Sequence, residues 1–524
     1  MSQSIRTKPV LILLQSVVAV RRLQAWLGLA SGTASSTVRA ALGLVAVGLC
    51  VSLVAACAVF RSYHLELGQT LDLVSAGKID AAIGTHESHA GDRDEKDLLY
   101  FLEKGELLRL AGRYSESQQA WLEADRRVAV WEEQARLHPE MLLRDAGSLL
   151  VNDKTRAYPG QDFEKVMLTT RIALNHLALG EWDEARVAIK RTHEREALIA
   201  ALRAKQVRRS EQAAGESGYT RDFRELNGYP VETIDSPEIN ALRNSYQNAF
   251  SHYLAGFLYE ALGETSLASA GYRQAIELQP GVALLEDGLA GLDARQAQRR
   301  KVVADSTVRT DLLVVVETGL APARRSVNIN LPIVKDEEVF FAPISFPVLE
   351  SQAGPAGARE IVVGEMLQAE GADITSVDLM SRRALKDEMP WIVLRAVTRA
   401  TVKVALQKAA SEEEDSRTAR AATKIGSIVT EQADERAWRS LPAEIAVARV
   451  RVEPGIHDIG VDVGGMQHRY RVNLDGPFAV MSVRQIGATA YMSISPASSS
   501  DATLQRANTH GDGQSRHRLE EDVL

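Results

Sequence analysis

The sequence predicts an α+β protein in which a helical-repeat half precedes a half built from short strands. Residues 61–304 are rich in Ala, Leu, Glu and Arg, and they repeat one pattern of glycines, aromatics and alanines. From residue 310 to 495, short apolar runs alternate with Gly and Pro, which is typical of strands. Because a chain of 524 residues has room for more than one domain, the two halves are expected as separate domains.

The clearest repeat of the helical half is residues 251–280. Gly256 and Ala268 are expected where two antiparallel helices cross, since a larger side chain would not fit there. Gly263 can take the left-handed conformation that ends the first helix, and Pro280 stops the second. These spacings are those of a tetratricopeptide (TPR) unit, which is a pair of antiparallel helices.

The same template recurs earlier in the chain. The glycines that end the first helices are Gly77, Gly112, Gly180 and Gly263. The first interval is close to the TPR period of about 34 residues and the second to two periods, so a degenerate unit is expected at 130–152. A polar insertion at 204–239 lengthens the last interval. Stacked units of this kind predict an α-solenoid of TPR-like helical hairpins at 61–304. For the first unit, a generic helical hairpin is an alternative.

A TPR solenoid binds peptides on the concave surface that its first helices form. Matching the template position by position places eight groove residues: Leu102, Arg109, Thr170, Leu174, Phe250, Tyr253, Phe257 and Glu260. The three aromatic residues are spaced three and four apart, so they share one helix face and would suit an apolar anchor of a partner. The alternative is that this face packs against residues 204–239 or against the C-terminal half.

The C-terminal half predicts a β-sandwich at 310–495, because seven or eight short apolar runs are separated by turn residues. The expected strands are 312–316, 327–331, 342–346, 360–364, 445–452, 457–463, 469–474 and 478–484. Tight turns at Gly464-Gly465 and Asp475-Gly476 predict that the last three strands form a meander. A helical hairpin is expected as an insertion at about 377–438, with its second helix over 421–436. Residues 496–524 lack apolar periodicity and predict a disordered tail.

The N-terminus carries an uncharged apolar run at 41–60, which is long enough to span a bilayer. Its end, Leu53-Val54-Ala55-Ala56-Cys57, resembles a bacterial lipobox, in which Cys57 would be lipidated. A secretory signal at 38–60 would leave residues 1–37 as a surplus upstream of the true start. An uncleaved transmembrane anchor is the alternative. Both interpretations place the rest of the chain outside the cytoplasmic membrane, and the resemblance to lipoproteins with no Asp after the cysteine favours the outer membrane.

Composition and motifs exclude several classes of site. A net charge of −8 gives no electrostatic footprint for nucleic acid. The two cysteines, Cys50 and Cys57, both lie in the apolar run, so the globular part has no disulfide or cysteine zinc site. No phosphate-binding glycine loop, nucleophile elbow or zinc-binding helix is present. The polar stretch with His86 and His89 is expected to be a loop. The sequence predicts no catalytic residue, metal or cofactor.

Five segments carry a resemblance to a known family: Tyr158–Lys165, Ala173–Leu177 with Gly180 and Ala185, Asn248–Leu254, Gly319–Pro322 and Ala433–Pro442. Through them, most of residues 158–484 resembles a poorly characterised family of proteobacterial TPR-containing envelope lipoproteins. The chain departs from that pattern at Ala249, where proline is expected, and in its extra N-terminus and tail. The resemblance implies an envelope lipoprotein without an established activity, and it supplies no catalytic residue.

These observations predict a non-enzymatic envelope lipoprotein that acts as a TPR interaction scaffold in cell-envelope assembly and faces the periplasm. Its partners would be other envelope proteins, bound in the groove, and the membrane, bound through the N-terminal anchor. The alternative is a glycan- or peptidoglycan-binding protein that uses the β-sandwich. Exposed aromatic side chains on a sheet would favour that alternative, and the candidates are Trp391, Trp438 and Tyr470.

Overall fold

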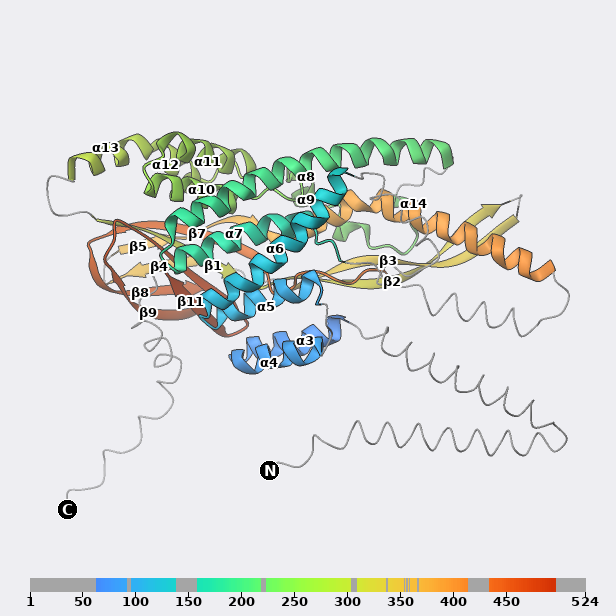
Figure 1. Ribbon diagram of the computed structural model, residues 1–524, viewed down its shortest axis with the longest axis horizontal. Coiled ribbons are helices and arrows are strands. Elements are labelled where there is room, and N and C mark those ends of the chain that lie inside the picture. The colour runs from blue at the N-terminus through green and yellow to red at the C-terminus, as the bar shows by residue number, and fades with distance from the viewer. Residues whose placement is uncertain are drawn as a thin grey trace, which may run out of the picture. The chain divides into compact units, whose positions relative to one another are not determined.

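Figure 1 shows a computed structural model of the chain. It describes residues 63–91, 96–137, 158–217, 223–302, 309–335, 338–352, 354, 357, 359–364, 367–412 and 433–495. The predicted signal or anchor at 38–60 with Cys57, the surplus at 1–37 and the tail at 496–524 lie outside the described residues. Among the helices described, none is both long enough and apolar enough to cross a bilayer.

The N-terminal half is helical, as the sequence predicts, and its helices come in antiparallel pairs. The four pairs are α3 (Tyr63–Ser75) with α4 (Ile79–Ala90), α5 (Leu98–Leu110) with α6 (Tyr114–Leu137), α7 (Asp162–Ala178) with α8 (Trp182–Ser217), and α10 (Ala249–Ala261) with α11 (Thr265–Leu278). The glycines between the paired helices, at 77, 112, 180 and 263, have φ angles of 72°, 73°, 78° and 79°. The predicted role of these glycines as left-handed helix ends is therefore confirmed.

Shorter helices complete this half. Between α8 and α10 lie η3 (Phe223–Glu225), η4 (Val231–Thr233) and α9 (Pro237–Ala241), and after α11 lie α12 (Ala283–Ala290) and α13 (Leu292–Val302). The degenerate unit predicted at 130–152 begins inside α6, and its remainder is outside the described residues.

Within two of the pairs, a glycine of the first helix receives an aromatic ring of the second. A Cβ atom added to Gly105 would lie 2.2 Å from Trp121, and one added to Gly256 would lie 2.6 Å from Tyr272. In both pairs the ring follows the glycine by 16 residues. Ala268 is fully buried as predicted. The two helix backbones also approach closely at Gly271, where an added Cβ would lie 2.7 Å from the Gly256 nitrogen.

The C-terminal part is made of sheets, one long ribbon and one long helix. A five-stranded sheet has the order β11 (Thr489–Ile494), β10 (Phe478–Ile486), β1 (Thr310–Thr318), β7 (Glu444–Val452), β6 (Ala372–Ser376). A four-stranded sheet has the order β5 (Leu367–Glu370), β4 (Arg359–Val363), β8 (Gly455–Val463), β9 (Met466–Leu474). The ribbon joins β2 (Leu320–Lys335) to β3 (Glu338–Gln352), and α14 (Val377–Glu412) runs beside it (Figure 1).

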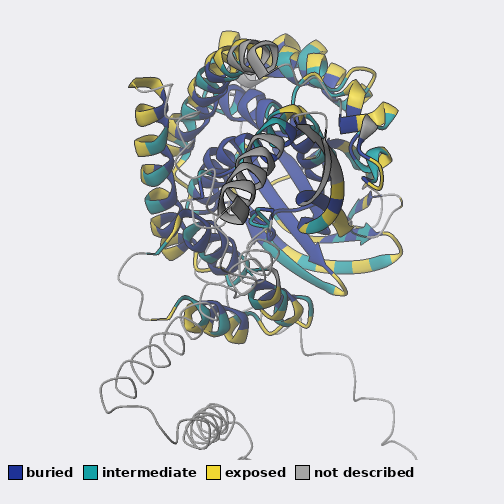
Figure 2. Ribbon diagram, turned by 90° about the vertical axis from the view of Figure 1, so that its right-hand side faces the viewer, coloured by how far each residue is buried: buried dark blue, intermediate teal, exposed yellow. Residues whose placement is uncertain are grey.

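Strand β1 is buried on both faces, which fixes the layers of the molecule. Leu312, Val314 and Val316 belong to an apolar core shared by the two sheets. Leu313 and Val315, which point to the opposite face, belong to a core shared with the helices. The layers are therefore helices, five-stranded sheet and four-stranded sheet. In Figure 2 the helices curve around strands that are coloured as buried.

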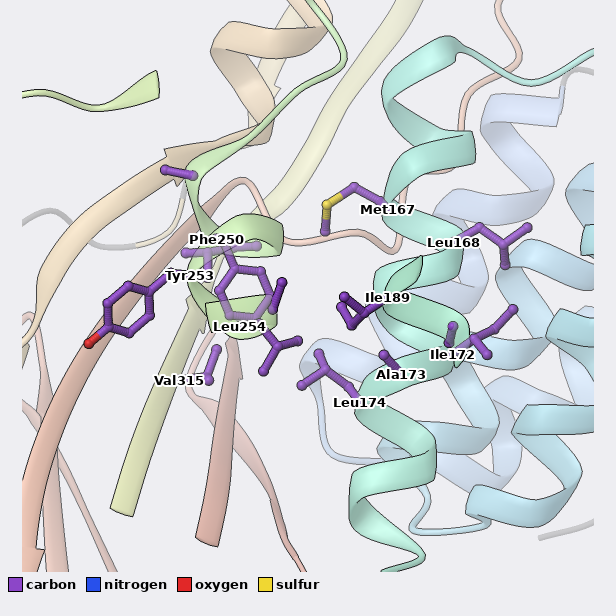
Figure 3. Close-up of a cluster of buried hydrophobic side chains, with 14 of the residues drawn as sticks. Met167, Leu168, Ile172, Ala173, Leu174, Ile189, Phe250, Tyr253, Leu254 and Val315 are labelled. Carbon is purple, nitrogen blue, oxygen red and sulfur yellow. The ribbon is translucent and has the colours of Figure 1, made fainter. Parts of the chain in front are cut away.

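The helical and strand-rich halves, predicted as two domains, share this first core. Figure 3 shows Leu174 of α7, Phe250 and Leu254 of α10 and Val315 of β1 pointing toward one another. All described residues fall in one compact unit that starts at Tyr63. Apolar side chains of the first helices are therefore covered by a sheet of the same chain.

Three predictions for the C-terminal half need correction. The turn at Gly464-Gly465 joins β8 to β9 as predicted, but β10 crosses to the other sheet and pairs in parallel with β1, so the three strands form no meander. The sequence reading missed the short strands β5 and β6 and the last strand β11. Residues 433–436 of the expected second inserted helix are not helical, and the rest of 421–432 lies outside the described residues.

Candidate functional site

The eight predicted groove residues are all buried, with exposed fractions between 0% and 7%. The ring of Phe257 meets the ring of Phe478 edge-on, with centroids 5.3 Å apart, and the Arg449 guanidinium lies 5.0 Å from the same ring. Tyr253 packs against Tyr272 at 5.3 Å. Of the two alternatives for this face, the open groove is therefore corrected, and the structure agrees with packing against the C-terminal half. The five-stranded sheet covers this face, because the second face of β1 and the aromatic stripe of α10 are both apolar and bury each other.

The polar members of the predicted groove also bond within the chain. Glu260 forms ion pairs with Arg295 at 2.6 Å and with Arg449 of β7 at 3.1 Å. The Arg109 guanidinium donates to Asn175 Oδ1 at 2.7 Å and to Ser493 Oγ of β11 at 3.2 Å. Thr170 and Ser251 hydroxyls are 2.7 Å apart and join α7 to α10. Leu102 and Leu174 lie in the apolar core.

A segment without helix or strand, Ala433–Ala443, lies against α5, α6 and α7, has a turn at Arg439 and Ser440, and forms the candidate site. We call it the internal peptide. Its central residue, Trp438, is fully buried, and its ring meets Trp121 of α6 with centroids 6.1 Å apart. The indole N–H of Trp438 donates to Ser440 Oγ at 3.0 Å. The side chain that anchors the segment is thus enclosed by the helices and satisfied in its hydrogen bonding.

Two carboxylates from neighbouring hairpins bind the backbone of the internal peptide. Glu164 of α7 accepts the N–H of Trp438 at 2.7 Å. Glu103 of α5 accepts the N–H of Arg439 at 2.8 Å and that of Ser440 at 3.2 Å. Three consecutive backbone donors are therefore held by helix carboxyl groups, and when the carboxyl is ionised such charge-assisted bonds are stronger than those between neutral groups. We call Glu103 and Glu164 the carboxylate clamp.

The other side of the internal peptide is joined to the strands. The Ala321 N–H donates to the Leu441 carbonyl at 2.8 Å, and the Ala443 N–H donates to the Thr318 carbonyl at 2.9 Å. Arg484 of β10 donates to the Ser440 carbonyl at 3.1 Å. The internal peptide therefore connects the helical layer to the five-stranded sheet.

Surrounding side chains hold the clamp in place. The Tyr63 hydroxyl donates to Glu103 at 2.9 Å, and the Tyr158 hydroxyl donates to Glu164 at 2.7 Å. Glu164 also accepts the backbone N–H of Gln161 at 2.9 Å, which caps the start of α7. Burial raises the pKa of the Glu103 carboxyl to about 7, although the bonds from Ser440, Arg439 and Tyr63 oppose that shift. Burial likewise raises the pKa of Glu164.

A buried ion cluster lies beside the clamp. Arg171 of α7 is fully buried between Glu317 of β1, at 2.5 Å, and Glu106 of α5, at 3.6 Å. Arg484 is also buried there, and burial lowers its pKa to about 10. Since buried charges are tolerated only when they are paired, this cluster fixes the register between the helices and the sheet.

Sequence reasoning missed the clamp and interpreted Asp434–Arg436 as a helix end. One signal was available in the sequence: Glu103, Glu106 and Arg109 occur three positions apart in a helix that is otherwise rich in leucine. In the structure all three side chains are buried. Charged residues on one buried face indicate a polar ligand or an internal polar segment.

The stretch with His86 and His89, expected as a loop, is helical because it belongs to α4, so that expectation is wrong. His86 stacks on Tyr100 with ring centroids 4.9 Å apart, and burial lowers its pKa to about 4. Among the described residues, no group of His, Cys, Asp and Glu has metal-binding geometry. Trp438 is buried, while Trp391 and Tyr470 are partly buried.

The outer face of the four-stranded sheet carries a shallow hollow of about 300 Å³. Gly460 of β8 forms part of its floor, and polar side chains surround it: Glu360, Asp458, Asp462, Gln467 and Arg469. None of the three candidate aromatic residues lines it.

Comparison of the chain with protein-family models, with curated proteins and with solved structures finds no match. The family resemblance carried by the sequence segments therefore stays a prediction.

Proposed function

We propose that this chain is a non-enzymatic envelope lipoprotein that acts as an interaction scaffold. In this proposal a TPR-like α-solenoid holds a β-sandwich by means of the internal peptide. The observation that supports it most is the carboxylate clamp, in which Glu103 and Glu164 bind three consecutive backbone N–H groups of a segment without regular secondary structure. Holding an extended peptide against the first helices is what TPR solenoids do with their partners.

Two packing features support the architecture. In the pairs Gly105–Trp121 and Gly256–Tyr272, an aromatic ring of the second helix packs against a glycine of the first. The spacing is the same in both pairs, as expected of related repeat units. Alternate residues of β1, β7 and β8 enter one core between two sheets, as expected of a sandwich.

The environment of the perturbed carboxyl groups favours a holding role over acid–base catalysis. Glu103 and Glu164 are fully enclosed, and their oxygen atoms contact backbone N–H groups and tyrosine hydroxyls of the same chain. A catalytic acid or base must reach a substrate from a cavity. The envelope assignment rests on the apolar run and on the lipobox-like segment that ends at Cys57.

Fractionation of cells that express the full chain, followed by mass spectrometry and cross-linking, tests the proposal. We expect the protein in the membrane fraction, a lipid on an N-terminal Cys57, and reproducible cross-links to other envelope proteins. An intact segment 41–60 in the mature chain would contradict the lipoprotein. A cytosolic location, or turnover of a cell-wall substrate by the purified chain, would contradict the scaffold.

A second candidate is glycan binding at the outer hollow, since carboxylates and an arginine around a floor without a side chain can bond sugar hydroxyls. Its volume is at the lower end of the range for small-molecule sites. Gly460→Val tests it, because the nearest atom to an added Cβ is 3.8 Å away, so the variant fills the hollow without a clash. Titration with peptidoglycan fragments should give binding to the parent and none to the variant; no binding to the parent excludes this candidate.

A further inference from the structure

Strand β9 forms a long open edge of the four-stranded sheet. It pairs with β8 over all of its nine residues, from Met466 opposite Val463 to Leu474 opposite Gly455. No described strand pairs with its other side, and no backbone hydrogen bond joins it to a described residue outside the sheet. Alternate backbone N–H and C=O groups of β9 therefore face outward, where another strand can bond to them.

The other edge strands of the two described sheets are short or in contact with helices, and the long strands of the β2–β3 ribbon pack against α14. β5 has four residues. Thr375 of β6 accepts a hydrogen bond from the Phe250 N–H of α10, and Tyr491 of β11 donates to the Val74 carbonyl of α3. β9 has neither a proline nor a register shift, two of the devices that block an edge, although its exposed Arg469 and Arg471 are charged side chains of the kind that discourages pairing with like-charged strands.

The two faces of β9 differ in chemistry. On the outer face Arg469 and Arg471 are exposed; Arg471 pairs with Asp458 at 3.0 Å, while Arg469 forms no ion pair with a described residue. On the inner face Tyr470 is partly buried and packs at the margin of the core between the sheets, as does Met492 of β11. A strand added beside β9 would place alternate side chains next to the arginines and against this apolar margin.

We propose that β9 binds an extended segment of a partner protein in which apolar residues alternate with acidic ones. The inward residues would cover Tyr470 and the outward carboxylates would lie opposite Arg469 and Arg471. A second copy of this chain fits less well, because antiparallel self-pairing centred on Tyr470 sets Arg469 of each copy opposite Arg471 of the other. This inference rests on the proposed scaffold function and supplies the partner surface that the filled helical groove does not.

The test uses the purified full chain and two blocked nine-residue peptides, one alternating Val with Glu and one alternating Val with Lys. Binding is measured by titration, and hydrogen exchange locates it. We expect the Glu peptide alone to bind and to slow exchange of the β9 amides. The double variant Arg469→Glu with Arg471→Glu should lose about tenfold or more in affinity for the Glu peptide and should gain binding to the Lys peptide.

A matched control reverses two arginines far from β9. Arg113 and Arg126 are exposed on α6 or just before it, and each pairs with a nearby glutamate. The variant Arg113→Glu with Arg126→Glu changes the net charge equally and should bind the Glu peptide as the parent does. Binding of neither peptide, equal binding of both, protection outside β9, or β9 protection that grows with protein concentration alone would each overturn the proposal. The peptide test does not depend on where the protein is located in the cell. The β9 proposal can therefore be overturned while the scaffold proposal stands.

Discussion

The carboxylate of Glu103 accepts the backbone N–H of Arg439 at 2.8 Å, although 336 positions separate the two residues in the chain. Through this bond and its neighbour to Ser440, the second helical hairpin holds the segment that leads into β7. The helical layer and the strands are thus joined by buried, directional bonds as well as by apolar packing. The stability of the whole chain should therefore respond to single changes at this junction.

Replacing Glu103 by alanine should destabilise the protein by about 2–5 kcal/mol, because it leaves two buried N–H donors without an acceptor. Urea unfolding followed by circular dichroism measures the loss. Glu116→Ala, which removes an exposed carboxylate of α6, serves as the control and should change the free energy of unfolding by less than about 0.5 kcal/mol. Equal stability of the two variants would show that Glu103 does not hold the internal peptide.

The raised pKa of Glu103 predicts a specific pH dependence. The folded protein keeps this proton until about pH 7, whereas the unfolded chain loses it near the ordinary glutamate pKa of 4.5. Between these pH values the folded state binds more protons, so the free energy of unfolding falls as pH rises, by up to about 3 kcal/mol from this group. The difference in the free energy of unfolding between the parent and Glu103→Gln, measured at pH 4.5 and 7.5, isolates the contribution of Glu103.

The contributions of other titrating groups to the free energy of unfolding cancel in that difference, because both proteins contain those groups. Burial lowers the pKa of His86 to about 4, so its contribution is lost as pH falls from about 6.5 toward 4, in the parent and in the variant alike. Burial also raises the pKa of Glu444 to about 7, which adds a term of the same sign as Glu103 to both proteins. If the difference in the free energy of unfolding between the parent and Glu103→Gln does not change with pH, the pKa of Glu103 is not raised by burial.

Arg171 should be the most sensitive member of the buried ion cluster. Arg171→Met leaves the carboxylates of Glu106 and Glu317 buried without their cation, which typically costs about 3–5 kcal/mol. Arg113→Met removes an exposed partner of Glu116 and should cost less than about 1 kcal/mol. Thermal unfolding of both variants at pH 7 compares them, and a stable Arg171→Met protein would mean that the cluster is open to water.

Two glycine-to-alanine substitutions should change the stability of the protein in opposite directions. Gly271→Ala puts a Cβ atom 2.7 Å from the Gly256 nitrogen, which forces α10 and α11 apart and should cost about 1–3 kcal/mol or more. Gly84→Ala, in the exposed part of α4, meets no atom within 4 Å and should stabilise the protein by up to about 1 kcal/mol. If both variants shift the melting temperature in the same direction, the helix crossing is misplaced.

Local features of this fold could be predicted from the sequence, because they depend on neighbouring residues. The glycines at 77, 112, 180 and 263 mark helix ends since only a residue without Cβ takes their φ angles easily. The apolar run at 312–316 predicts a strand buried on both faces, as β1 is.

Long-range features could not be predicted in the same way. Periodicity shows that Phe250, Tyr253 and Phe257 share an apolar face, but it does not show whether a partner or a sheet of the same chain covers that face. The same limit applies to β10, whose alternation fits a hairpin with β9 as well as the parallel pairing with β1 that forms. The clamp was missed for this reason too, since Glu103 and Arg439, whose backbone N–H it binds, lie 336 positions apart in the chain.

The most direct test of the attachment of the internal peptide to the helices is the hydrogen exchange of the amides of Trp438, Arg439 and Ser440 in the full chain. If the internal peptide is held as described, these three amides exchange only on global unfolding, at the rate of the core amides of β1, and the double variant Glu103→Ala with Glu164→Ala exchanges them faster than those core amides. Exchange of the three amides within seconds in the parent, while α5, α7 and β1 remain protected, would show that the carboxylate clamp does not hold the segment.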